Sequence, residues 1–143
     1  MKRLVFLIIF AALAADVGRA SDTDNIVVIV NPESGVERLT RDEVIDIFLG
    51  RYRKLPSGRI ALPIDVASSA ERDRFYQLLV KKSPAEISSY WARLVFSGQT
   101  SPPYRVPDTR TAVELVESNP NAIAYVDRAS VNARVKVVLE ITH

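Results

Sequence analysis

Residues 83–98 read SPAEISSYWARLVFSG, and three independent signals in this stretch predict a single helix. Ser83 is a good N-cap, Pro84 fits the first helical position, and Glu86 completes a capping box. Gly98 is a typical helix end. Apolar residues recur every three or four positions in between and give the helix one apolar face: Ile87, Tyr90, Trp91, Leu94 and Val95. The only tryptophan lies in the middle of this face, which favours a core-packing helix over an aromatic ligand platform.

Strands and helices alternate on both sides of this helix. The β-branched run NIVVIVN at residues 25–31 predicts a buried strand. Pro63, inside a predicted strand at residues 59–66, indicates a sheet edge or a strand end. Residues 99–107 are predicted to form a loop. The remaining expected elements are a helix at 40–49 closed by Gly50, a helix capped by Ser68 or Ser69, a helix that starts at Asp108 or Thr109, and strands at 122–126 and 134–141. This order predicts an α/β sandwich, a mixed sheet flanked by helices.

The first twenty residues have the pattern of a secretory signal peptide. Lys2 and Arg3 precede an apolar run at residues 4–15, and the small-x-small triplet Gly18-Arg19-Ala20 predicts cleavage after residue 20. The run is shorter than the ~20 residues that span a bilayer, which disfavours the alternative of an uncleaved anchor. The chain has no cysteine, which excludes a lipid-anchored lipoprotein and disulfides. We therefore expect a signal peptide at 1–20, one domain at 21–143, periplasmic location and no stable membrane anchor after cleavage.

The charge of the exported part excludes one class of partner. The whole chain has 19 basic and 17 acidic residues, with an isoelectric point near 9.0. Three of the basic residues and one of the acidic residues lie in the predicted signal peptide, so 16 of each remain. The basic excess therefore belongs to the signal, and nucleic-acid binding is not expected.

The residue types and motifs of the sequence do not indicate any enzymatic reaction. The only histidine is the final residue, His143, and neither a G-x-G-x-x-G motif nor a P-loop occurs. Asp42, Glu43 and Asp46 could serve acid–base chemistry or a divalent cation, but acids in a first helical turn complement the helix dipole. We expect no catalytic residues, no metal site and no cofactor, hence not an enzyme.

The passage from Asp65 to Ser69 is where a ligand site is most plausible. A predicted strand ends there and a helix begins, so backbone N–H groups, hydroxyls and the helix dipole could hold an anion. The alternative is that a serine simply caps the helix.

The order of motifs resembles the phosphate-type substrate-binding proteins of ABC transporters, within the type II periplasmic binding proteins. The motifs are VIVNP at 28–32, LTRDEVIDIFLG at 39–50, Phe75, YW at 90–91, FSG at 96–98 and AIAYV at 122–126. Members of that family have two α/β lobes around a ligand cleft. The resemblance implies that this chain is a short, single-lobe member, similar chiefly to the second lobe with its hinge strands.

The family's anion site has an arginine shortly before a Gly-Ser-Gly-Thr turn, with a phenylalanine four residues after the threonine. Aligned on Phe75, this turn falls on residues 68–71, which read SSAE, and the arginine position is Asp65. The resemblance implies a candidate anion site at Ser68, Ser69 and Arg72, with Arg72 one residue beyond the threonine position.

Two functions follow as hypotheses. One is a secreted, non-catalytic solute-binding-like protein for phosphate or another small anion, linked to an ABC transporter permease. The alternative is an accessory protein-interaction or sensory module that contacts another envelope protein and has lost the ligand site.

Overall fold

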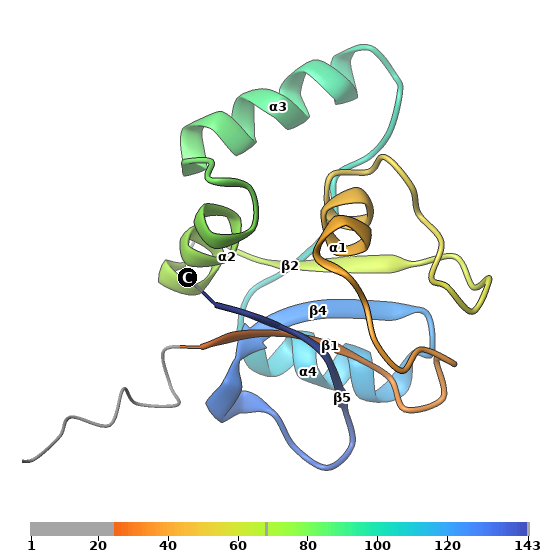
Figure 1. Ribbon diagram of the computed structural model, residues 1–143. Coiled ribbons are helices and arrows are strands. Elements are labelled where there is room, and N and C mark those ends of the chain that lie inside the picture. The colour runs from red at the N-terminus through yellow and green to blue at the C-terminus, as the bar shows by residue number, and fades with distance from the viewer. Residues whose placement is uncertain (1–24, 68, 143) are drawn as a thin grey trace, which may run out of the picture.

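The computed structural model describes residues 25–67 and 69–142, which form a five-stranded mixed sheet in the order β3-β2-β4-β1-β5 (Figure 1). β2 is parallel to both β3 and β4, whereas β1 is antiparallel to β4 and to β5. The central strands are buried on both faces, which is why they are rich in Val, Ile and Ala. The strands are β1 Ile26–Val30, β2 Leu62–Val66, β3 Tyr104–Val106, β4 Ala122–Asp127 and β5 Lys136–Ile141.

Helices cover both faces of the sheet. α4 lies on one face, α1 and α2 lie on the other, and α3 lies outside α1 and α2 (Figure 1). Capping boxes start α1 at Thr40 and α3 at Ser83, as the sequence predicts. The helices are α1 Arg41–Phe48, α2 Ala70–Val80, α3 Pro84–Phe96, α4 Thr109–Ser118 and the short 3-10 turn η2 Arg128–Ser130.

An aromatic cluster joins α1, α2 and the sheet. Phe75 of α2 stacks on Tyr125 of β4 with ring centroids 3.9 Å apart. Phe48 of α1 meets the Phe75 ring edge-on at 4.9 Å. All three rings are fully buried. This cluster fixes α2 over the carboxyl end of the parallel strands, because burial of an aromatic side chain is among the larger contributions to a core.

Several sequence predictions are confirmed and others are wrong. The predicted α/β class, the helix at 83–98 and the core position of Trp91 are confirmed. The predicted loop at 99–107 is wrong in part, because β3 lies within it. Pro63 lies in an interior strand, but β3 pairs with β2 only from Ile64 onward, so no strand flanks Pro63 on that side.

The predicted signal peptide lies outside the described residues. Within the described part of the chain, no helix has the length and apolarity needed to cross a membrane.

Candidate functional site

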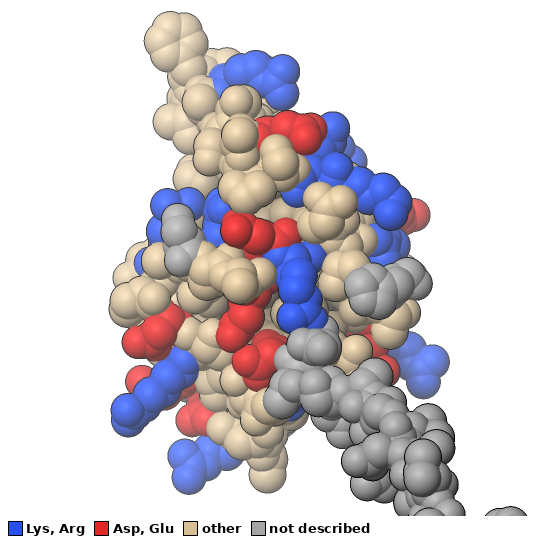
Figure 2. Space-filling view, turned by 90° about the vertical axis from the view of Figure 1, so that its left-hand side faces the viewer, with Lys and Arg blue, Asp and Glu red and all other residues tan. Residues whose placement is uncertain are grey.

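The parallel strands β2, β3 and β4 end at one edge of the sheet, and this edge is the candidate site. α2 begins just after β2, α4 just after β3, and η2 directly after β4. In open α/β sheets, ligands bind outside the carboxyl ends of the strands. Figure 2 looks onto the side that lies on the left in Figure 1, where α2 and the loop after β4 are found. Acidic side chains gather there around a few basic ones.

Ser69 caps α2, which is the structural alternative weighed for this position. Its hydroxyl oxygen accepts the N–H of Arg72 at 3.1 Å, and its carbonyl accepts the N–H of Asp73 at 3.1 Å. Both oxygens thus serve the first turn of the helix itself. Ser68 lies outside the described residues. The anion site at Ser68, Ser69 and Arg72 stays a prediction.

Arg72 points into the protein instead of toward solvent. Its Nε lies 3.0 Å from Oδ2 of Asp65, and the two residues are only 5% and 3% exposed. Its guanidinium carbon lies 5.1 Å from the ring centroid of Tyr76. Burial works to lower the pKa of Arg72, but the charge and hydrogen bond of Asp65 outweigh it and raise that pKa. Arg72 therefore stays charged and is neutralised by Asp65.

The second oxygen of Asp65 is also engaged. The Tyr125 hydroxyl donates to Oδ1 of Asp65 and accepts the backbone N–H of Val66 at 3.2 Å. Burial raises the pKa of Tyr125, and the adjacent Asp65 charge raises it further, so the phenol stays protonated. Asp65, Arg72 and Tyr125 together form a closed, buried polar network, which we call the Asp65 network.

Two acidic residues, Glu71 of α2 and Asp127 of β4, lie near the start of α4. The Thr109 hydroxyl donates to Oε2 of Glu71 at 2.6 Å. Burial raises the pKa of Glu71, the Thr109 hydrogen bond opposes this, and the neighbouring Asp127 raises it again. Asp127 itself accepts from the backbone and hydroxyl of Ser130 at 2.8 and 2.7 Å. Two carboxylates thus lie near the place where an anion would approach, and they repel it.

Arg105 is a residue that sequence reasoning missed. It is exposed on β3 and pairs in register with Asp65 on β2, so both side chains face the same side of the sheet. Its charge lowers the pKa of Tyr76, against the larger effect of burial, which places it near the Asp65 network. From sequence, residues 99–107 are predicted to form a loop, because the three residues of β3 carry too little periodicity to predict a strand, and Arg105 is therefore not placed at the site. Among the described residues, no group of three or more His, Cys, Asp or Glu side chains could hold a metal ion.

Solved structures with a similar fold include three proteins described as phosphate receptors or phosphate-binding proteins. An ABC-type phosphate transport receptor from Vibrio cholerae matches with a TM-score of 0.63 and 20% identity over 80% of this chain. The chain shares its fold with part of this receptor. A putative phosphate ABC transporter substrate-binding protein from Clostridium perfringens, solved with bound phosphate, matches with a TM-score of 0.62 and 21% identity over 80% of this chain.

A possible phosphate binding protein from Planctomyces limnophilus matches more distantly, with a TM-score of 0.56 and 15% identity over 80% of this chain. The chain spans only 45%, 44% and 40% of the lengths of these three neighbours. No protein-family model matches the sequence, and no curated protein is significantly similar to it. The comparisons therefore identify the fold, and the identities of 15–21% carry no further statement about the ligand.

Proposed function

We propose that this chain is an exported, non-catalytic binding module that contacts another envelope protein and does not capture phosphate tightly. The observation that carries this proposal is the ion pair between Arg72 and Asp65, 3.0 Å apart and almost fully buried. The Nε–H donor and the charge of Arg72 are thus taken up by Asp65, so a phosphate has to compete with a buried carboxylate for this guanidinium. Glu71 and Asp127 add negative charge at the same edge.

An exposed apolar helix end favours protein contact. Phe96, the last residue of α3, is 96% exposed, and Val95 beside it is 54% exposed. Large apolar side chains that are exposed side by side are typical of protein-interaction surfaces. An ABC transporter permease or another envelope protein is the class of partner that the predicted export and the shared fold suggest.

Phosphate or another small anion is the second candidate ligand. It is supported by the phosphate named for the structural neighbours and by the exposed Arg105 beside the start of α2. Ser68, Ser69 and Arg72 would form the rest of that site. A solute-binding role linked to ABC transport follows only if this site binds.

Isothermal titration calorimetry of the purified protein with inorganic phosphate separates the two functions. We expect no saturable heat up to about 5 mM phosphate, a concentration at which a millimolar site would be visible. A saturable isotherm with a micromolar Kd that Arg105→Met weakens would overturn the proposal in favour of anion binding. Arg59→Met is the matched control, because it removes one exposed cation before β2, at the opposite edge of the sheet.

A further inference from the structure

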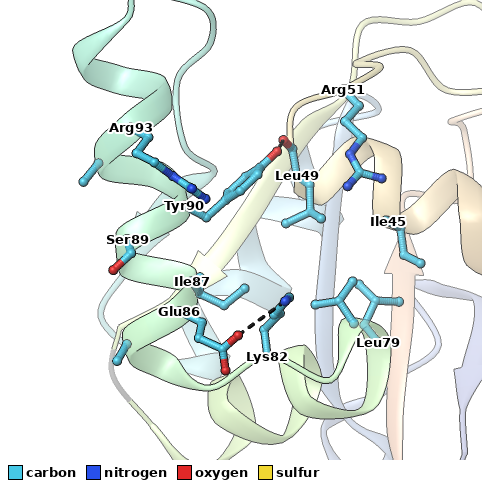
Figure 3. Close-up of a pocket in the computed structure, with 13 residues that line it drawn as sticks. Ile45, Leu49, Arg51, Leu79, Lys82, Glu86, Ile87, Ser89, Tyr90 and Arg93 are labelled. Atoms are coloured by element: carbon cyan, nitrogen blue, oxygen red, sulfur yellow. Dashed lines mark hydrogen bonds and ion pairs between the residues drawn. The ribbon is translucent and has the colours of Figure 1, made fainter.

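A wide groove separates α3 from the rest of the molecule, and we call it the α3 groove (Figure 3). It has a volume of about 880 Å³ and is lined by α1, by the end of α2 with the residues that follow it, and by the inner face of α3. Its floor is apolar: Leu49, Leu79 and Ile87 lie almost fully buried beneath it, and the partly exposed side chains of Ile45 and Tyr90 offer the contact surface (Figure 3). The groove lies apart from the Asp65 network, with which it shares no lining residue.

The groove exists because few contacts hold α3 to the body. The Tyr90 hydroxyl donates to the carbonyl of Leu49 at 2.7 Å, and Trp91 is buried against the turn at Gly50. On the groove wall, α3 has the small exposed residues Ala85, Ser89 and Ala92. Small side chains leave room for another backbone to approach the helix closely.

Exposed Phe96 extends the same wall. It lies four residues after Ala92 and seven after Ser89, and residues at these spacings share one helix face. Its 96% exposure therefore adds an accessible aromatic side chain at the end of α3. Tyr, Trp and Phe side chains at such positions are the usual anchors of protein interfaces.

The charges that line the groove are mostly positive. Three cations, Arg51, Lys82 and Arg93, and one carboxylate, Glu86, line the groove, and Arg51 also lies 3.9 Å from Asp46 beside it. Lys82 pairs with Glu86 at 3.3 Å, whereas Arg93 makes no ion pair with another described residue. Arg51 and Arg93 lie on opposite sides of the groove, with Tyr90 and Leu49 between them (Figure 3). An occupant that complements this pattern has an apolar face with carboxylates on both flanks.

We propose that the α3 groove binds an amphipathic helix of another protein whose apolar face is flanked by Asp or Glu residues. This rests on the proposed function and names the surface and the chemistry of the partner. The 13 residues of α3 make a wall of about 20 Å, which matches three to four turns of a partner helix. In helix-in-groove recognition the apolar face of the helix lies in an apolar groove, and complementary charges at the rim add specificity. A symmetric dimer in which two α3 grooves face each other is disfavoured, because each groove would bring the same excess of cations.

Fluorescence anisotropy with two designed peptides tests the proposal. Both are fluorescein-labelled 15-residue helices with leucines along one face, and they differ only in carrying Glu or Lys on the flanks. We expect the Glu peptide to bind at least about ten-fold more tightly than the Lys peptide, and to weaken several-fold between low and high salt. Arg93→Glu reverses one charge at the rim and should weaken the Glu peptide about five-fold or more.

Two further variants test whether the peptide binds in the groove. Ala92→Gln places bulk in the groove at an exposed position and should weaken the Glu peptide without lowering the melting temperature. Arg110→Glu makes the same charge change as Arg93→Glu on α4, outside the groove, and should leave binding unchanged.

Three results overturn the proposal: no binding of either peptide, equal binding of both, or a dimer in sedimentation that Ala92→Gln dissociates, which would make a second copy the occupant. The phosphate titration is independent of these readouts. Tight phosphate binding would refute the proposed function. Failure of the peptides to bind would refute only the proposal for the α3 groove.

Discussion

The buried pair between Arg72 and Asp65 leads to the most specific prediction about stability. Their side chains are 6% and 4% exposed and their charged atoms are 3.0 Å apart. At an effective dielectric constant of about 20, this separation corresponds to a gross attraction of about 5 kcal/mol. Removal of one partner leaves the other charge buried without compensation, which costs about 3–5 kcal/mol in proteins. Against a total stability of about 5–15 kcal/mol, this is a large fraction.

We therefore expect Arg72→Met and Asp65→Leu each to lower the free energy of unfolding by about 3–5 kcal/mol, or the melting temperature by about 10–20 °C. The double variant should recover most of this loss, because it leaves no unpaired buried charge. Urea denaturation followed by the fluorescence of Trp91, the only tryptophan, measures all three. Arg110→Met, at an 88% exposed side chain, is the control and should change stability by less than about 0.5 kcal/mol.

The reasoning is refuted if Arg72→Met costs less than about 1 kcal/mol. Such a result would mean that Arg72 is not held by Asp65 and is free to meet an anion. Additive losses in the double variant would also contradict it, because they would show that the two residues do not interact.

Three other changes test separate parts of the structure. Glu71→Gln should raise the melting temperature by about 2 °C at pH 8, because the pKa of Glu71 is raised and its ionised form near Asp127 therefore costs stability. This gain should vanish as the pH falls below the pKa of Glu71, where the carboxyl group is protonated. Equal gains at pH 8 and pH 4 would contradict this reasoning. Gly50→Ala should cost more than Gly58→Ala in urea denaturation, because both have positive φ but only at Gly50 would the new Cβ lie within 3.1 Å of other side chains, and equal losses would leave crowding without effect. Tyr90→Phe removes a 2.7 Å hydrogen bond between α3 and α1 and should cost about 1 kcal/mol; no loss would show that α3 is held by packing alone.

Local sequence signals predicted the elements whose causes are local. The capping boxes at Thr40 and Ser83 and the helical spacing around Trp91 depend on neighbours three or four residues away, so the sequence shows them directly. The strand β3 escaped prediction because three residues between prolines carry too little periodicity, and its pairing with β2 is set by tertiary contacts.

The location of the candidate site could be predicted from the sequence, but the buried pairing of its arginine could not. The strand end at Asp65 and the cap at Ser69 follow from sequence, and they put the site at the start of α2. The partner of Arg72 did not follow, because arginine on a helix is usually solvated and its inward direction depends on the distant Tyr125 and on the rings packed around it. Asp65, which stands where the resemblance implies an arginine, is the residue that holds Arg72.

The central claim, that Asp65 engages Arg72 so that it does not bind phosphate, is tested most directly by the NMR signal of the Arg72 side-chain Nε–H group. This signal is assigned by its loss in Arg72→Met and followed in a phosphate titration up to about 10 mM, a range that reveals even millimolar affinity. We predict a signal that exchanges slowly with solvent, as expected for a buried hydrogen bond, and that does not shift with phosphate. A saturable shift of the Arg72 signal with added phosphate would contradict the account.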